Sequence, residues 1–149
     1  MSATDPIDVV RRYLDAANAG DLEALAALQA PGFVHHSGAG DLDADGVRQG
    51  LTYYRTAFPD LVYDAAEMWT VDGGSAVVAR WTMRGTHRGP FNGAAPTGRT
   101  FASDGLSLHR ITGDRIAEDW EYGDDVGVLQ SLGFTVQGPP AASDASEAS

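Results

Sequence analysis

The side chains best suited to chemistry lie on two short segments near the carboxyl end of this sequence. Ser107 and His109 alternate along one predicted strand, and Asp119 and Glu121 alternate along the next. Because successive side chains of a strand point to opposite faces, the two members of each pair share a face. A carboxylate close to an imidazole or a hydroxyl can take up and return a proton, which is general acid–base chemistry. By residue type alone, Glu121 could equally be paired with an arginine or exposed to solvent.

The remaining histidines are the other candidates. His35 and His36 are adjacent in a segment predicted to be extended, so only one of them can point inward, and we favour His36. His87 lies in a predicted loop and is expected to line the mouth of a pocket, whereas His109 suits a buried, hydrogen-bonded imidazole. The histidines and carboxylates show no spacing that is typical of metal ligands, so no metal site is expected.

Composition disfavours several classes of function. The chain has 149 residues, a formal net charge of -11, no cysteine and no lysine. The negative charge disfavours nucleic acid and anionic membranes as partners. The missing residue types exclude thiolate chemistry and a lysine Schiff base. Residues 1–6 are polar and lead straight into a predicted helix, so we expect no signal peptide and a cytoplasmic location.

The elements that would position these residues follow from periodicity and turn residues. Helices are predicted over 6–19, 21–28, from Asp43 or Asp45 to about 58, and over 124–132. Strands are predicted over 33–36, 61–71, 76–83, 100–111 and 115–122, with a turn at 31–32 before the first of them. Helices followed by antiparallel hairpins are typical of an α+β domain, expected over 1–136. The tail 137–149, rich in Pro, Ala and Ser, is expected to be disordered.

Three segments carry a family resemblance, namely 87–99, 108–111 and 119–133. They are similar to the SnoaL-like polyketide cyclases, which belong to the NTF2-like folds, and the resemblance extends over roughly residues 6–134. It implies an NTF2-like cone in which helices pack on a strongly curved, mainly antiparallel sheet that encloses an apolar pocket.

The resemblance also implies a chemistry. In characterised members, an aspartate on the last strand is the general acid and base of an intramolecular aldol ring closure, assisted by a histidine on the preceding strand. The positions that match carry Glu121 and Ser107 here. The family therefore implies a cofactor-independent cyclase of bacterial secondary metabolism, of the kind used in antibiotic biosynthesis, with Glu121 as the catalytic base and Ser107 and His36 as its hydrogen-bond partners.

The expected substrate is a hydrophobic, polyketide-like small molecule. The residues expected to bind it are Tyr13, Phe33, His35, Tyr54, Phe58, Trp69, Trp81, Met83, His87, Phe91, His109 and Asp119. Two alternatives stay open, because this superfold hosts many activities. One is epoxide hydrolysis or isomerisation with Asp119 as a second carboxylate. The other is a pocket that only binds its ligand or templates a pericyclic closure.

A last expectation concerns the other face of the same two strands. Leu106, Leu108, Trp120 and Tyr122 alternate with the polar set, so if the polar set faces the interior of the cone, these four cover the outer face of the sheet. An apolar outer face needs a partner, so we expect a homodimer formed through it.

Overall fold

The computed structural model describes residues 3–142 and shows four α-helices and six strands. In chain order they are α1 (Pro6–Ala19), α2 (Leu22–Ala27), β1 (Gln29–Ser37), β2 (Gly40–Leu42), α3 (Ala44–Ala57), β3 (Val62–Val71), a 3-10 turn (Asp72–Gly74), β4 (Ala76–Thr86), β5 (Thr100–Thr112), β6 (Arg115–Gly123) and α4 (Asp125–Ser131). The α+β fold is thereby confirmed. Of the tail expected to be disordered, residues 137–142 form no helix or strand, and residues 143–149 lie outside the described part.

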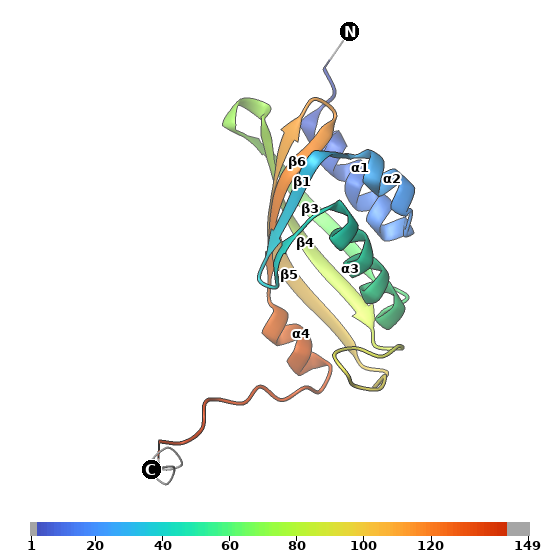
Figure 1. Cartoon of the computed structure of the whole chain (residues 1–149), viewed down its shortest axis with the longest axis vertical. Coiled ribbons are helices and arrows are strands. Elements are labelled where there is room, and N and C mark those ends of the chain that lie inside the picture. The colour runs from blue at the N-terminus through green and yellow to red at the C-terminus, as the bar shows by residue number, and fades with distance from the viewer. Residues whose placement is uncertain (1–2, 143–149) are drawn as a thin grey trace.

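The six strands form one sheet in the order β2-β1-β6-β5-β4-β3. Neighbouring strands are antiparallel except β1 and β6, which run parallel. The helices α1, α2 and α3 lie on one face of this strongly curved sheet (Figure 1), and the opposite face carries no helix within residues 3–142. This is the cone expected from the resemblance. None of the helices in that range is long and apolar enough to cross a membrane.

Aspartates fix where the helices begin. Asp5, Asp21, Asp43 and Asp124 are N-cap residues, and each carboxylate accepts a hydrogen bond from a backbone N–H of the first turn at 2.8 to 3.0 Å. Such caps satisfy amide groups that have no partner within the helix. At the other end of α1, Gly20 has a φ of 67°, which glycine adopts without strain. The helix boundaries were predictable because these signals are local.

Two irregular positions in the sheet were not predictable in the same way. The turn expected at Pro31–Gly32 lies inside β1, where the pairing with β6 shifts register between Gln29 and Val34. In β3 the pairing with β4 shifts between Ala65 and Glu67. An extra residue in a strand reverses which side chains face inward beyond it. Met68 therefore packs against the core after the shift, and Trp69 faces outward.

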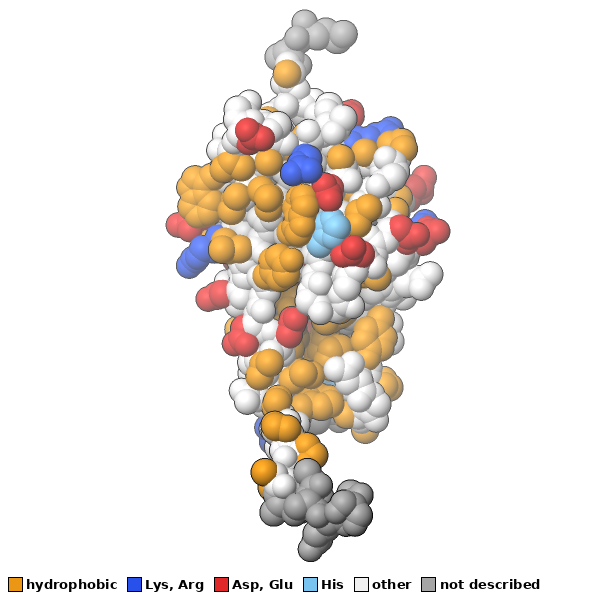
Figure 2. All heavy atoms as spheres, turned by 60° about the vertical axis from the view of Figure 1, so that its left-hand side comes forward, with side chains coloured by type: hydrophobic (Ala, Val, Ile, Leu, Met, Phe, Trp, Pro, Cys, Tyr) orange, Lys and Arg blue, Asp and Glu red, His pale blue; other side chains and the backbone are white. Residues whose placement is uncertain are grey.

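The uncovered face of the sheet carries an apolar band. Cross-strand partners place Trp69, Val78, Leu108 and Trp120 in one row, with Leu106 and Tyr122 in the row beside it. Of these, Trp69, Leu106 and Tyr122 are 47%, 52% and 59% exposed. Figure 2 shows hydrophobic side chains gathered on this side of the molecule among charged ones. We call these six residues the outer apolar face.

Candidate active site

A cavity of about 230 Å³ lies between the inner face of the sheet and the helices α1 and α3. Its helical walls are largely apolar, with Leu14 and Ala17 on α1 and Val47 and Leu51 on α3. The sheet contributes Trp81 and Met83 from β4 and Ser103 from β5, together with polar groups from β1 and β6. Exposed residues of the β1–β2 hairpin and of the start of α4 form its rim, namely Gly38, Ala39, Leu42 and Asp125. An apolar cavity with few polar groups is typical of a small-molecule site.

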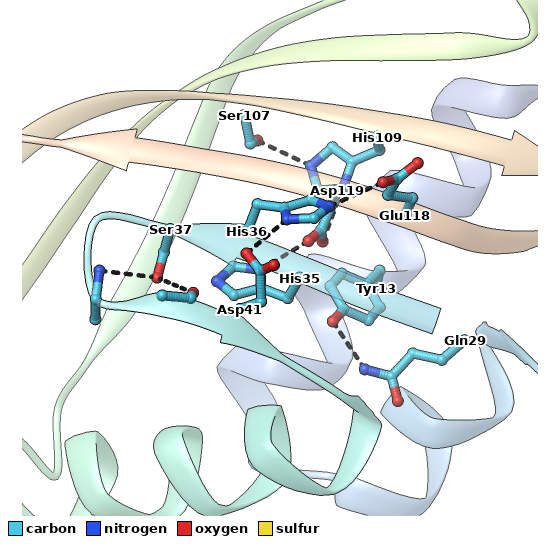
Figure 3. Close-up of polar contacts among 12 residues, drawn as sticks. Tyr13, Gln29, His35, His36, Ser37, Asp41, Ser107, His109, Glu118 and Asp119 are labelled. Carbon is cyan, nitrogen blue, oxygen red and sulfur yellow. Dashed lines mark hydrogen bonds and ion pairs between the residues drawn. The ribbon is translucent and has the colours of Figure 1, made fainter. Parts of the chain in front are cut away.

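A connected row of polar side chains crosses the inner face of the sheet beside the cavity (Figure 3). His35 Nδ1 lies 2.7 Å from Asp119 Oδ1, and His109 Nδ1 lies 3.4 Å from Asp119 Oδ2. The other nitrogen of His109 is 2.8 Å from Ser107 Oγ. The pairing of the strands explains the row, because Asp119 is opposite both His35 on β1 and His109 on β5. His35 and Asp119 line the cavity, and Ser107 and His109 support them from behind.

The two imidazoles keep Asp119 ionised although it is only 3% exposed. Burial alone would raise the pKa of Asp119, but the neighbouring imidazoles of His109 and His35 outweigh burial, and the pKa falls below 3.8. Burial likewise opposes charge on His35, but the Asp119 carboxylate raises the pKa of His35 above 6.5. The pair therefore favours an imidazolium next to a carboxylate.

Glu121 is the next inward residue of β6 and lines the same cavity. Its cross-strand partners are Ser107 and Ser37, and no arginine or histidine forms an ion pair with it within residues 3–142. Burial raises the pKa of the Glu121 carboxyl above 4.5, against the attraction of His35 and with the repulsion of Asp119. A carboxylate shifted in this direction is a stronger base and is poised closer to neutral pH.

Three tyrosines from different elements surround the carboxylates, Tyr13 on α1, Tyr54 on α3 and Tyr63 on β3. Burial, reinforced by the negative charge of Glu121, raises the pKa of each phenol above its ordinary value of 10.0. Each hydroxyl therefore stays protonated and can donate a hydrogen bond at neutral pH. Tyr13 also accepts a hydrogen bond of 3.1 Å from the Gln29 side chain.

The structure brings most of the expected site residues to one place. Seven line the cavity, namely Tyr13, His35, Tyr54, Trp81, Met83, Asp119 and Glu121. Ser107 and His109 lie behind it in the polar row. Contact of these residues with a substrate remains a prediction.

His36 is a correction. Its imidazole lies on the outer side of the sheet, where it stacks on Trp120 and its nitrogens lie 2.7 Å from Asp41 and 2.8 Å from Glu118. The physical reason is the parallel pairing of β1 with β6, which sets His35 opposite inward-facing Asp119 and His36 opposite outward-facing Trp120. The sequence held a signal for this, because Phe33 is apolar and shares the phase of His35.

Five further residues expected at the pocket lie elsewhere. Trp69 faces outward because the register shift in β3 reverses its phase. Phe33 is buried in the core between α1, α2 and the sheet. Phe58 and Phe91 pack behind the cavity wall, in the core cluster that also includes Trp81 and Met83, and their ring centroids are 5.0 Å apart. His87 is fully buried and fastens the loop over 87–99, since its Nδ1 accepts a hydrogen bond from the Thr97 N–H at 3.2 Å.

The sequence reasoning missed Tyr63, which reaches the cavity from an edge strand. Its pairing with Met83 places the two side chains on the same face of the sheet. Tyr63 and Ala65 are two residues apart, so the sequence indicates that their side chains share one face of the strand. Which face points into the cavity is known only once the neighbouring strand and its register are known.

Comparisons with known proteins agree with this architecture. The model of the family described as SnoaL-like polyketide cyclase matches residues 7–132. Aklanonic acid methyl ester cyclase DnrD of Streptomyces peucetius is 27% identical over 136 residues, which are 85% of this chain and 90% of that protein. IdmH, a putative polyketide cyclase from Streptomyces antibioticus, is 33% identical with a TM-score of 0.78, over 88% of this chain and 100% of that one. AclR from Streptomyces galilaeus, a putative hydroxylase, shares the fold. It is 23% identical with a TM-score of 0.80, over 98% of this chain and 92% of that one.

Proposed function

This chain belongs to the SnoaL-like polyketide cyclase family, and from that premise we propose that it closes a ring in a hydrophobic, polyketide-like molecule by cofactor-independent acid–base chemistry. The observation that carries this proposal is Glu121. Within residues 3–142 no cationic side chain pairs with this carboxylate, it lines an apolar cavity, and burial raises its pKa. These are the properties of a general base.

The reaction balances without any other reactant. Glu121 removes a proton from a carbon between two carbonyl groups of the substrate, which leaves an enolate. The enolate carbon attacks a second carbonyl carbon of the same molecule, a carbon–carbon bond forms, and the electron pair moves onto the carbonyl oxygen. The protonated Glu121 then gives its proton to this alkoxide, so that the carboxylate is restored.

We propose that the His35–Asp119 pair takes the role expected of His36, which was to assist Glu121 by hydrogen bonding. His35 faces the cavity as an imidazolium held by Asp119, and it can donate a hydrogen bond to the oxygen of the enolate. Asp119 holds His35 and His109 in position, and Ser107 in turn contacts His109. We therefore propose that Ser107 acts through this row and that His35 contacts the substrate.

The charge of the cavity indicates what kind of substrate enters. Among the described residues, its lining contains the carboxylates of Asp119, Glu121 and Asp125 but no arginine. The His35 imidazolium pairs with Asp119, so Glu121 and Asp125 leave the lining net negative. An anionic substrate would be repelled in such a site. A neutral molecule, in which a carboxylic acid is masked as an ester, fits better. The relative DnrD is described as a cyclase of aklanonic acid methyl ester, which has this property.

The deciding experiment compares Glu121→Gln with the unaltered protein. Aklanonic acid methyl ester and a smaller methyl ester with an acidic C–H are the probes, and ring closure is followed by absorbance. We expect the rate to fall about 1,000-fold in the variant, since glutamine cannot accept the proton. Ligand affinity, measured by quenching of tryptophan fluorescence, should change little.

Glu118→Gln is the matched control, because Glu118 lies on the same strand but contacts His36 and Arg110 on the outer side. It should leave the rate unchanged. Equal rates for the Glu121→Gln variant and the unaltered protein, or no ring closure of either probe, would contradict the acid–base proposal.

One observation favours the epoxide alternative as a second candidate. Asp119 and Glu121 both line the cavity, so the second carboxylate that epoxide opening requires is present. Asp119 is engaged by two imidazoles, however, which leaves Glu121 alone to activate water. Hydrolysis of an aryl epoxide in ¹⁸O-labelled water, with label in the diol and loss in Glu121→Gln, would favour this reaction over ring closure. A pocket that only templates a pericyclic closure predicts instead a rate that is independent of pH and of Glu121.

A further inference from the structure

Tyr63 is held in the cavity wall by contacts on both its backbone and its ring. The Asn18 side chain on α1 accepts a hydrogen bond from the Tyr63 N–H and donates one to the Tyr63 carbonyl, each at 2.8 Å. The Tyr63 ring meets the Trp81 ring nearly edge to face, with centroids 5.4 Å apart. Such edge-to-face pairs fix the orientation of both rings.

The contact with Asn18 replaces a missing strand. β3 is the last strand of the sheet, so its outer edge has backbone groups without a strand partner. A side-chain amide offers one donor and one acceptor, which are the groups that a neighbouring strand would present. Asn18 thus ties the edge strand to α1 at the residue whose side chain reaches the cavity.

Tyr63 and Glu121 line the same cavity, and burial together with the negative charge of Glu121 raises the pKa of the Tyr63 phenol, so its hydroxyl keeps the proton that it can donate. Tyr13 also lines the cavity, but its hydroxyl is held by a hydrogen bond that it accepts from Gln29, whereas no such contact holds the Tyr63 hydroxyl among the described residues. The Tyr63 hydroxyl can donate to two acceptors, one before and one after Glu121 takes the proton. The first is the carboxylate before proton transfer, and the second is the substrate oxygen that becomes negative afterwards.

We propose that Tyr63 is a catalytic hydrogen-bond donor for the oxygen that gains negative charge during ring closure, and that Asn18 is the positioning residue that aims it. The proposal deepens the function proposed above and rests on it. When Glu121 takes the substrate proton it becomes neutral and no longer needs the donor. The Tyr63 hydroxyl is then free to donate to the new alkoxide, to which Glu121 returns the proton.

Interactions of this kind accelerate a reaction because they are stronger in the transition state than in the bound substrate. Loss of a single oxyanion donor typically lowers kcat by about 100-fold to 1,000-fold. Misplacement of about 1 Å also lowers the rate strongly, which is why the backbone contact with Asn18 matters.

The first test is Tyr63→Phe, which keeps the ring on Trp81 and removes only the hydroxyl. With aklanonic acid methyl ester as the probe, we expect kcat to fall about 100-fold while KM changes less than about twofold. Tyr53→Phe is the matched control, because it removes a phenol hydroxyl that contacts Asn92 outside the cavity. A kcat of Tyr63→Phe within about twofold of the unaltered protein would overturn the proposal.

The second test separates positioning from a purely structural role of Asn18. Asn18→Ala should lower kcat about tenfold, since the backbone of Tyr63 loses two hydrogen bonds and its hydroxyl is no longer held in position. Added to Tyr63→Phe, it should lower kcat no further, because the hydroxyl that it positions is already gone. Losses that multiply in the double variant would show that Asn18 does not act through the hydroxyl, and this part of the proposal would fall.

The two proposals fail in different ways. If Glu121→Gln retains full activity, acid–base ring closure itself is wrong. If Glu121→Gln is inactive but Tyr63→Phe is fully active, the base is correct and only the role of Tyr63 is wrong.

Discussion

Asp119 and Glu121 are two residues apart on one strand and line one cavity, yet their surroundings shift their pKa values in opposite directions. Asp119 has two imidazole partners, which lower its pKa against the effect of burial. Glu121 has none in direct contact, and burial raises its pKa. Pairs of carboxylates separated in this way divide the work of a site, one as a fixed charge and the other as a group that exchanges protons.

The raised pKa of Glu121 gives a prediction for the pH dependence of activity. A base must be ionised to act, so kcat/KM should rise with pH through the pKa of Glu121, and the midpoint should lie above the ordinary value of 4.5. A pH–rate profile of the unaltered protein measures this midpoint. The control Glu118→Gln should show the same midpoint, and a flat profile would contradict the role of Glu121.

The His35–Asp119 pair gives a prediction for stability. The pKa of His35 is raised above 6.5 in the folded state, so its contribution to stability is complete below pH 6.5 and is lost as the pH rises through the folded value. The pKa of Asp119 is lowered, so its contribution is complete above pH 3.8 and is lost as the pH falls through the folded value. Between these limits both contributions are present.

Asp119→Asn should therefore destabilise the protein most near pH 6, by about 3 kcal/mol, because it breaks a buried pair. The difference from the unaltered protein should shrink as the pH rises above 6.5 and His35 loses its proton. Urea unfolding at a series of pH values measures the free energy of unfolding. Asp8→Asn, which removes an exposed partner of Arg11, should have little effect at any pH, and an equally small effect of Asp119→Asn would refute the buried pair.

At the scale of the elements, two glycines on neighbouring strands make room for the Trp81 ring. Gly105 on β5 and Gly123 on β6 are cross-strand partners. A Cβ atom at Gly105 would lie 2.3 Å from the Trp81 ring and 2.7 Å from the Tyr122 carbonyl oxygen, and one at Gly123 would lie 3.0 Å from the ring. The missing side chains let the indole lie across the sheet and form part of the cavity wall.

Gly105→Ala should move this ring. We expect a loss of about 2 kcal/mol in the free energy of unfolding, since overpacking a core displaces rings and backbone. The displaced indole should also weaken ligand binding, measured by titration with the probe ester. In contrast, Gly50→Ala should stabilise α3 by about 0.5 kcal/mol, because a Cβ there meets nothing within 4 Å and alanine favours helices. Stability of Gly105→Ala equal to that of the unaltered protein would contradict this packing.

At the scale of the whole molecule, the outer apolar face is not covered by any helix of residues 3–142. Its most exposed members are Leu106 and Tyr122, both more than half exposed. Ion pairs flank it, between Arg80 and Glu67 at 3.9 Å and between Arg110 and Glu118 at 2.9 Å. Neighbouring charges of both signs let the face pair with itself around a two-fold axis. We propose that a second copy of the chain covers it.

Leu106→Glu should then separate the two copies, since a buried carboxylate without a partner strongly disfavours association. Light scattering coupled to size-exclusion chromatography should give the mass of two chains for the unaltered protein and of one chain for the variant. Val136→Glu changes a comparably exposed residue beyond α4 and should leave the dimer intact. A monomer at every concentration of the unaltered protein would exclude this dimer.

The sequence by itself determined the four helices, the last four strands and the faces of the last two, but it missed β2 and the first residues of β1. Caps, turn glycines and alternation are local signals, so Asp43 and Asp124 indicate where helices begin. The period of two along a strand likewise assigns Ser107 and His109 to one face of β5, and Asp119 and Glu121 to one face of β6. The family resemblance then supplied the cone.

Only the tertiary structure decided which side chains meet. The parallel pairing of β1 with β6 chose His35 over His36, and the register shift in β3 turned Trp69 outward. The contact of α1 with β3 anchors Tyr63 in the wall of the cavity that Glu121 also lines. These choices depend on partners far apart in the chain, and a shift of one residue reverses every side chain beyond it. Alternation gives the phase of a strand, but the neighbouring strand decides which phase faces the cavity.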